Sequence, residues 1–200
     1  MSDITKKSSP KILGLDVSTK TIGWALFDIE SKDLLELTHI SPLANPKVEN
    51  KIEGLMLKSG VFRSKLIEYV GLNIDKVVIE EPLLNSNNVN TVGTLIRYNT
   101  LICREVYDVL GVVPEFISTY NSRKFAFPEL VQKNNKDKFV LFGGLDKDID
   151  KKMVIWELVS KKEPQINWQY TKNNTLKKEN FDMSDAYACA LGYMKMKELW

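Results

Sequence analysis

The sequence is poor in the residue types that bind soft metals or form disulfides. Its 200 residues include one histidine, His39, and two cysteines, Cys103 and Cys189. The cysteines fall in segments expected to be helical and lack metal-ligand spacing, so we interpret them as buried thiols of a protein from a reducing compartment. His39 falls on an expected strand, where we interpret it as a structural or solvated residue rather than a ligand.

Long apolar runs and a strong net charge are also missing. No run approaches the roughly 18 apolar residues that would cross a membrane. Residues 1–10, MSDITKKSSP, are polar and lack the apolar core of a signal peptide. We therefore expect a disordered tail over 1–10 and a cytoplasmic protein with no membrane partner. The formal net charge of +2 excludes no class of partner by itself.

The composition is ordinary for a globular domain, but its charge is unevenly placed. Apolar residues make up 44% and charged residues 27%, and the length suits one domain. Thirteen basic and seven acidic residues lie between Arg123 and Lys178, an excess of six positive charges where the whole chain has two. This segment also contains aromatic residues and is compatible with contact to a phosphate backbone. A solvated surface rich in lysine and asparagine remains the alternative.

The first 120 residues predict a mixed sheet. We expect strands over 12–17, 21–30, 34–41, 76–80 and 112–119, and helices over 48–70 and 89–110. Three antiparallel strands followed by parallel strands that alternate with helices predict an α/β fold with helices on both faces. This is the order found in ribonuclease H-like domains.

The pattern is looser beyond Tyr120. We expect a short helix over 121–126, an insertion around 128–147, a helix over 148–160, a polar loop over 161–180 and a final helix over 182–199. Residues 11–200 therefore form a single expected domain. The segments 128–147 and 161–180 are candidates for an arm or a DNA-binding flap.

Four acidic residues stand at the ends of apolar elements. Asp16 ends the first strand, Glu80 (followed by Glu81) ends the fourth, and Asp182 and Asp185 open the last helix. If the first and fourth strands are parallel neighbours, their acids project from the same edge of the sheet, where ligand sites of open α/β sheets lie. A solvated turn for Asp16 and a lysine partner for Glu80 are the alternatives.

The two aspartates of the last helix lie on one helical face, three residues apart. The helical face that contains Asp185 continues with small and apolar residues, namely Ala188, Cys189, Gly192 and Met196. Such a face packs closely on a sheet, so Asp185 is expected to face the sheet. Helix capping is an equally good explanation for Asp182.

Four converging carboxylates would repel one another unless cations neutralised them. Oxygen ligands without histidine or cysteine favour Mg²⁺ or Mn²⁺ over zinc. Two such ions held about 3.5–4 Å apart can activate water and stabilise the leaving oxygen in phosphodiester hydrolysis. The residues therefore predict a metal-dependent phosphodiesterase.

Three segments, ILGLDVSTKTIGWALFD, VVIEEPL and DMSDAYACAL, resemble in order and spacing the acidic motifs of RuvC-type Holliday junction resolvases. The resemblance spans residues 12–194. It implies a ribonuclease H-like nuclease that works as a homodimer with two Mg²⁺ ions per site, for which Mn²⁺ would substitute. It also implies a four-way DNA junction as substrate, resolved by paired symmetric nicks that leave ligatable ends.

The resemblance assigns roles residue by residue. It implies that the catalytic metal ligands are Asp16, Glu80, Asp182 and Asp185; Glu81 is the weaker match. The basic segments STYNSRKFAF and DIDKKMV place Lys124 and Lys151 near the scissile phosphate. Arg123 and Lys152 are close substitutes and further DNA-contacting residues.

The chain departs from the family at Leu83, where the family often has an aromatic residue that enters the junction. We still assign Leu83 to the DNA contact, with an altered effect on junction opening or sequence preference. The resemblance also implies dimerisation through the helix 89–110, by way of Leu95, Ile96, Ile102 and Val106. Packing of this helix on its own sheet is the alternative.

Other functions are compatible with the same motifs. The first is a ribonuclease H-like nuclease acting on another branched DNA or a structured RNA. The second is an inactive junction-binding protein, which the complete set of acids disfavours. A sugar-kinase-like ATPase shares the strand, aspartate and turn of the first motif, but the chain has room for one such domain and lacks a glycine-rich adenosine motif.

Overall fold

The computed structural model describes residues 8–43, 48–82, 88–146 and 148–200. Leu83 and residues 1–7 of the expected tail therefore lie outside the described residues. One five-stranded sheet has the order β3-β2-β1-β4-β5, with β1, β2 and β3 antiparallel and β4 and β5 parallel to β1. This is the predicted mixed sheet. Its strands are β1 (Lys11–Val17), β2 (Ile22–Asp28), β3 (Leu34–Ile40), β4 (Ile74–Glu80) and β5 (Glu115–Ile117).

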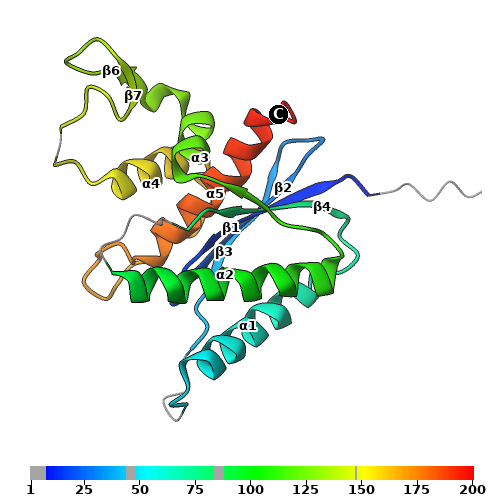
Figure 1. Cartoon of the computed structure of the whole chain (residues 1–200). Helices are drawn as coiled ribbons and strands as arrows, with labels where there is room; N and C mark the ends of the chain where they lie inside the picture. The colour runs from blue at the N-terminus through cyan, green and yellow to red at the C-terminus, as the bar shows by residue number, and fades with distance from the viewer. Residues whose placement is uncertain (1–7, 44–47, 83–87, 147) are drawn as a thin grey trace, which may run out of the picture.

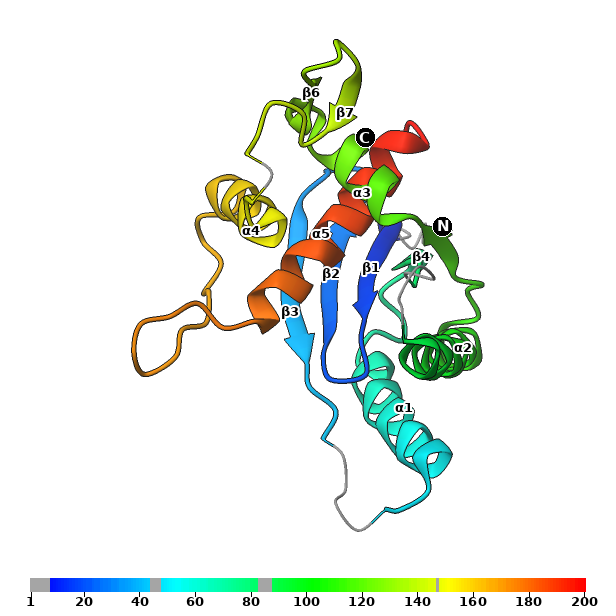
Figure 2. The ribbon, with the colours of Figure 1, turned by 60° about the vertical axis from the view of Figure 1, so that its left-hand side comes forward.

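Helices cover both faces of the sheet (Figures 1 and 2). Alternate residues of β1 face opposite sides: Ile12 packs into one apolar core, and Leu13 and Leu15 into the other. Such burial on both sides explains why the strands are almost continuously apolar. The first core lies under α3 (Thr119–Ala126), α4 (Lys151–Lys162) and α5 (Glu179–Met196), and the second under α1 (Lys51–Ile67) and α2 (Val89–Leu110).

The helix α5 packs unusually close to β1 and β2. A Cβ atom at Gly14 would lie 2.5 Å from the carbonyl oxygen of Ala186, and one at Gly23 would lie 1.9 Å from that of Asp182. Only glycine leaves room for a helix backbone at these distances. The alanines at 186 and 190 serve the same close contact from the helix side. These small residues set the height of α5 above the sheet.

Several element boundaries differ from the sequence-based expectation, and helix caps explain two of the differences. The helix α2 has the expected range and ends at Gly111, which is left-handed with a φ of 70°. Asn50 caps α1 and Asp150 caps α4, so both helices begin three residues later than expected. The strand β5 is shorter than predicted because Pro114, just before it, has no N–H for a ladder. The helix α5 begins earlier, at Glu179.

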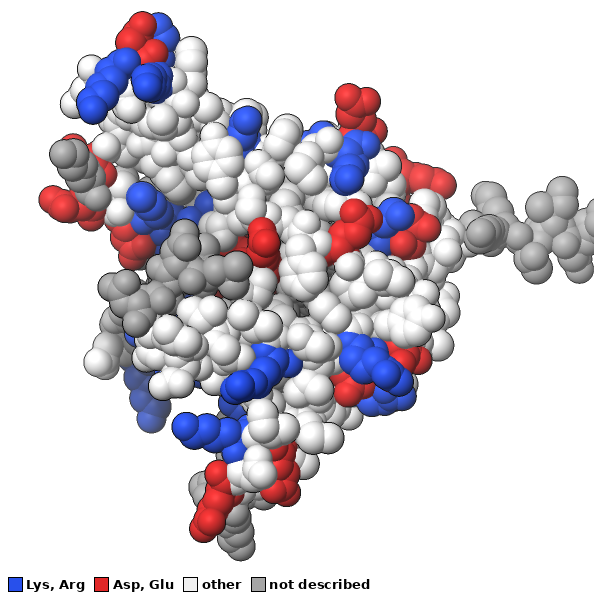
Figure 3. Space-filling view, in the orientation of Figure 1, with Lys and Arg blue, Asp and Glu red and all other residues white. Residues whose placement is uncertain are grey.

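The expected insertion forms a short 3₁₀ turn (Pro128–Leu130) and a hairpin of β6 (Val131–Lys133) and β7 (Phe139–Leu141). Lys and Arg side chains gather over this hairpin, at the upper left in Figure 3. The hairpin separates α3 from α4 along the chain.

The two cysteines and the single histidine differ in how deeply they are buried. Both cysteines are free thiols; Cys189 is buried as expected, whereas Cys103 is only partly buried. His39 lies on β3, and burial lowers its pKa. None of the helices in the described parts of the chain is long and apolar enough to span a membrane.

A substitution at the tight contact of α5 tests this packing. Gly23→Ala is expected to lower the free energy of unfolding by about 1–3 kcal/mol or more, because the new methyl group overlaps a backbone carbonyl. The control is Gly60→Ala on α1, whose Cβ would meet nothing within 4 Å. It is expected to raise stability by about 0.5–1 kcal/mol through helix propensity. Urea unfolding of both variants checks this; equal effects would show that α5 does not rest on Gly23.

Candidate metal centre

Two of the acids come from neighbouring parallel strands. Leu15 of β1 lies opposite Ile79 of β4, so the residues that follow them, Asp16 and Glu80, leave the sheet at the same edge. This is the arrangement that the apolar strands ending in acid predicted. Both strands are held on two sides in the sheet, so both carboxylates start from rigid backbone.

The other two acids come from α5, which lies across this edge. Asp185 is 3% exposed and faces the sheet, as its stripe of small residues predicted. Asp182 stands in the first turn of the helix, whose N-cap position is Lys178 with no side-chain cap bond. The N-cap alternative for Asp182 is therefore wrong, although a carboxylate in a first turn still interacts favourably with the helix dipole.

Three carboxylates converge closely enough to share a metal ion. One oxygen each of Asp16, Glu80 and Asp185 lies within 4.8 Å of the other two. Asp182 stands beside them and lines the same cavity of about 350 Å³, which opens the cluster to the surface. The structure thus brings all four predicted acids to one place, with Asp182 at its margin.

Two cations contact the acids. Arg123 of α3 donates a 2.8 Å hydrogen bond from Nη2 to Oδ1 of Asp185. The ammonium group of Lys152 on α4 lies 3.4 Å from Oδ2 of Asp185 and 3.6 Å from Oδ1 of Asp182. Both cations therefore hold the acids of α5, and no ion pair with Asp16 or Glu80 occurs among the described residues.

Glu80 has two neighbours that the sequence reasoning missed. Thr119 donates a hydrogen bond from its hydroxyl to Oε1 of Glu80, and Sγ of Cys189 lies 3.9 Å from Oε2. Thr119 follows β5, which is parallel to β4, so the rule that places Glu80 at this edge also places Thr119 there. The hydrogen bond fixes the orientation of the Glu80 carboxylate.

The electrostatics show a shortage of positive charge. Burial raises the pKa of Asp16 well above its ordinary value, and the charges of Glu80 and Asp185 raise it further. Burial first, and then Asp185, raise the pKa of Glu80 to about 7, although the hydrogen bond from Thr119 acts against this. Burial also raises the pKa of Asp182, opposed by Lys152. Two protein cations do not neutralise four acids.

These features fit a divalent cation. The donor set consists of carboxylate oxygens, as Mg²⁺ and Mn²⁺ prefer. The raised pKa values mark the place where added positive charge would be most favourable. Asp16, Glu80 and Asp185 would hold such an ion, with Asp182 beside them.

The other predicted residues lie around this centre. Nζ of Lys124 lies 5.8 Å from the ring centroid of Tyr120, and Nζ of Lys151 lies 5.7 Å from the ring centroid of Phe142. Neither forms an ion pair with a described acid of the cluster, in contrast to Arg123 and Lys152. Glu81 is exposed at the rim of the cavity and is not part of the converging set.

Comparison with protein-family models and with curated proteins finds no match. Among solved structures, Thermus thermophilus RuvC superposes with a TM-score of 0.57 at 15% sequence identity, over 94% of this chain and 96% of that one. T. thermophilus RuvC in complex with a Holliday junction substrate gives a TM-score of 0.57 at 12% identity, over 94% and 95%. The chain has the fold of RuvC. The likeness confirms the predicted ribonuclease H-like fold, and at this identity it concerns the fold alone.

The raised pKa values of the acidic cluster lead to a prediction about how stability depends on pH and on Mg²⁺. Between pH 4.5 and about 7, folded Glu80 binds a proton that the unfolded chain has released, so stability without metal falls as the pH rises. In EDTA, the melting temperature is expected to drop across this range, with a free-energy loss on the order of 2 kcal/mol. Added Mg²⁺ should reverse the drop at high pH, because it binds the ionised carboxylates.

Thermal melts across pH, with and without Mg²⁺, check this prediction. The control is Glu80→Gln, whose side chain does not titrate, so its pH dependence in EDTA should be flatter than that of the wild type. A wild-type melting temperature that rises steadily with pH in EDTA, with no response to Mg²⁺, would contradict the proposed centre.

Proposed function

We propose that this chain is a Mg²⁺-dependent, structure-selective endonuclease that resolves four-way DNA junctions by paired symmetric nicks. The observation that carries the proposal is the convergence of the partly buried Asp16 and Glu80 with the buried Asp185, within 4.8 Å, at the edge of a RuvC-like sheet. Two ions held by these residues and Asp182 would activate water and stabilise the leaving 3′ oxygen. Mn²⁺ is expected to replace Mg²⁺.

The chain's own residues supply the rest of the chemistry. Asp16 and Glu80 stand on strands, which keeps the ligand geometry rigid. Arg123 and Lys152 orient the carboxylates of α5 and offset negative charge as it develops on the phosphate. Lys124 and Lys151, on the same two helices, are proposed to bind the substrate phosphates from the rim.

The fold also supports a second candidate, a nuclease acting on another branched DNA or a structured RNA. The RuvC complex in the comparison contains a Holliday junction substrate, which favours the junction. An inactive junction-binding protein is the third candidate, and the complete set of four acids disfavours it.

Cleavage of a labelled four-way junction tests the function. Wild type in Mg²⁺ is expected to make paired symmetric nicks, and EDTA should abolish them. Asp16→Asn is expected to reduce the rate by about 100-fold or more, because a ligand and its charge are lost. The matched control is Asp75→Asn, an exposed aspartate at the start of β4, which should leave the rate unchanged.

Linear duplex DNA and a structured RNA are tested as substrates in the same assay as the junction. Equal or faster cleavage of either molecule would show that it, rather than the junction, is the substrate. The proposed metal chemistry would be unaffected by this result. Tight junction binding without a nick in Mg²⁺ or Mn²⁺ would favour the inactive protein.

The proposed homodimer has a suitable surface along α2. Ile102 and Val106 do not contribute, because both are fully buried in the chain's own core; the expectation that they face a partner is wrong. The exposed apolar residues of the helix are Val89, Ile96 and Tyr107, which are 81%, 43% and 55% exposed. These positions lie seven and eleven residues apart and so share one helical face.

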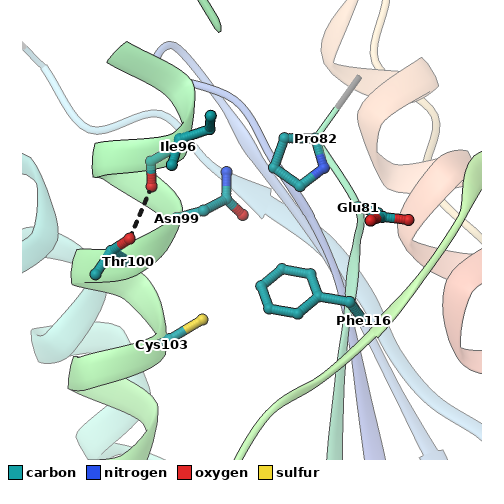
Figure 4. Close-up of a pocket in the computed structure, with 7 residues that line it drawn as sticks. All are labelled: Glu81, Pro82, Ile96, Asn99, Thr100, Cys103 and Phe116. Atoms are coloured by element: carbon teal, nitrogen blue, oxygen red, sulfur yellow. Dashed lines mark hydrogen bonds between the residues drawn. The ribbon is translucent and has the colours of Figure 1, made fainter. Parts of the chain in front are cut away.

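A cavity of about 450 Å³ adjoins this face, between α2 and the segment after β4 (Figure 4). Ile96, Cys103 and Phe116 give it an apolar lining. Oδ1 of Asn99 is buried there without a hydrogen-bond partner among the described residues. A side chain from a second copy of the chain would fill this cavity and satisfy the amide, so we propose this face as the dimer interface.

Sedimentation analysis of Ile96→Asp tests the interface. The substitution is expected to weaken dimerisation at least about tenfold, because it places a charge in a desolvated contact. Ile52→Asp is the matched control, since Ile52 is similarly exposed, at 46%, on α1. If Ile96→Asp weakens dimerisation no more than Ile52→Asp does, the dimer interface does not lie on this face of α2.

A further inference from the structure

The acidic cavity adjoins two further cavities. The three share Ser18, which stands in the turn between β1 and β2. One flank, of about 570 Å³, extends toward α4 and the start of α5 and also shares Lys152 and Asp182 with the acidic cavity. The other, of about 400 Å³, extends toward the starts of α1 and α2 and also shares Leu95. Figure 2 shows this turn at the bottom of the sheet, between α5 on one side and α1 and α2 on the other. The three cavities form one trough.

The floor of the trough is a rigid turn. The hydroxyl of Ser18 donates to the carbonyl oxygen of Thr21 at 2.8 Å and accepts from the N–H groups of Thr21 at 3.0 Å and Lys20 at 3.3 Å. Nζ of Lys58 donates to the carbonyl oxygen of Thr19. The side chains of this turn therefore start from a fixed backbone directly beside Asp16.

The two flanks carry exposed lysines. Lys20 and Lys178 line one flank, together with the acids Asp150 and Glu179, and Lys51 lines the other. All three are exposed, and none forms an ion pair with an acid in the described parts of the chain. Some other lysines are paired: Nζ of Lys133 lies 2.7 Å from Oδ1 of Asp137, and Nζ of Lys65 lies 2.8 Å from Oε2 of Glu68. Three unpaired ammonium groups flank an acidic centre.

We propose that this trough binds the sugar-phosphate backbone of the nucleic-acid strand that is cut, with Lys20 and Lys178 on phosphates to one side of the scissile bond and Lys51 on the other side. Ammonium groups on both sides of the acids would contact phosphates of a backbone that crosses them and set which phosphodiester lies over Asp16. The proposal rests on the proposed endonuclease activity for the identity of the centre. The flanking lysines and the adjoining cavities carry it independently of the dimer.

Salt-dependent binding tests the trough. The Asp16→Asn protein is expected to cleave bound DNA slowly enough for binding to be measured in Mg²⁺. In this background we compare a trough variant, Lys20→Gln/Lys51→Gln/Lys178→Gln, with a hairpin variant, Lys133→Gln/Lys136→Gln/Lys138→Gln. The two variants remove equal charge from exposed positions. Each phosphate contact contributes about 0.9 to the slope of log K against log salt for duplex DNA. The trough variant is expected to lower the slope for a labelled junction by about 2–3, and the hairpin variant by much less.

The outcomes separate this proposal from the endonuclease proposal. A slope that is unchanged in the trough variant, or that falls only in the hairpin variant, would overturn the trough even if the wild type cleaves junctions. A slope that falls in the trough variant supports the trough even if the wild type cleaves nothing. In a cleaving wild-type background, the three trough substitutions should raise KM at least about tenfold and change kcat little, because they act on binding before the chemical step. Thermal melts confirm that both variants are folded.

Discussion

The close approach of α5 to β1 and β2 is the contact on which the candidate site depends. At Gly14 and Gly23, backbone carbonyls of the helix occupy the space where a side chain would otherwise stand. The helix therefore lies low enough for Asp185 to meet acids that project from strand ends. A helix resting on larger side chains would hold Asp185 away from Asp16 and Glu80, and the four acids would be separate surface groups. The two apolar cores stabilise this packing from both faces of the sheet.

The same packing creates an electrostatic cost. Burial favours the neutral form of each acid, and the proximity of the acids adds repulsion, so the pKa of Asp16 and Glu80 is raised. Apolar residues at these two positions would make the folded state more stable. Buried acids that lower stability in this way are typical of functional sites. Arg123 and Lys152 relieve part of the cost, and both contact the acids of α5 rather than those of the strands. The remaining negative charge is concentrated where the strands end, and that is where a cation is best placed.

Much of this could be predicted from the sequence because it depends on strand direction and helical period. Apolar strands that end in acid, and that are parallel neighbours, must present their acids at one edge. A helical stripe of small residues that includes Asp185 must face the sheet. The order of antiparallel and parallel strands follows from the spacing between apolar segments, since only the parallel connections contain a helix. These rules gave the sheet, its two covered faces and the positions of all four acids.

Features that depend on the exact phase of α2, α3 and α4 could not be predicted, in contrast to the orientation of Asp185 on α5. Consecutive residues of a helix point about 100° apart, so a change of one position decides whether Arg123 or Lys124 faces the acids. That phase is set by Ser118 and Asp150, which cap α3 and α4, and the periodicity of these short polar helices is too weak to reveal it. Phase also explains α2, where Ile102 and Val106 face inward and Ile96 faces outward although all are apolar. The acids thus stand on elements whose orientation the core dictates, whereas the cations stand on peripheral helices that the hairpin of β6 and β7 separates in sequence. The sheet and the tightly packed α5 therefore determine where the acids lie, whereas the positions of the cations depend on how α3 and α4 are oriented.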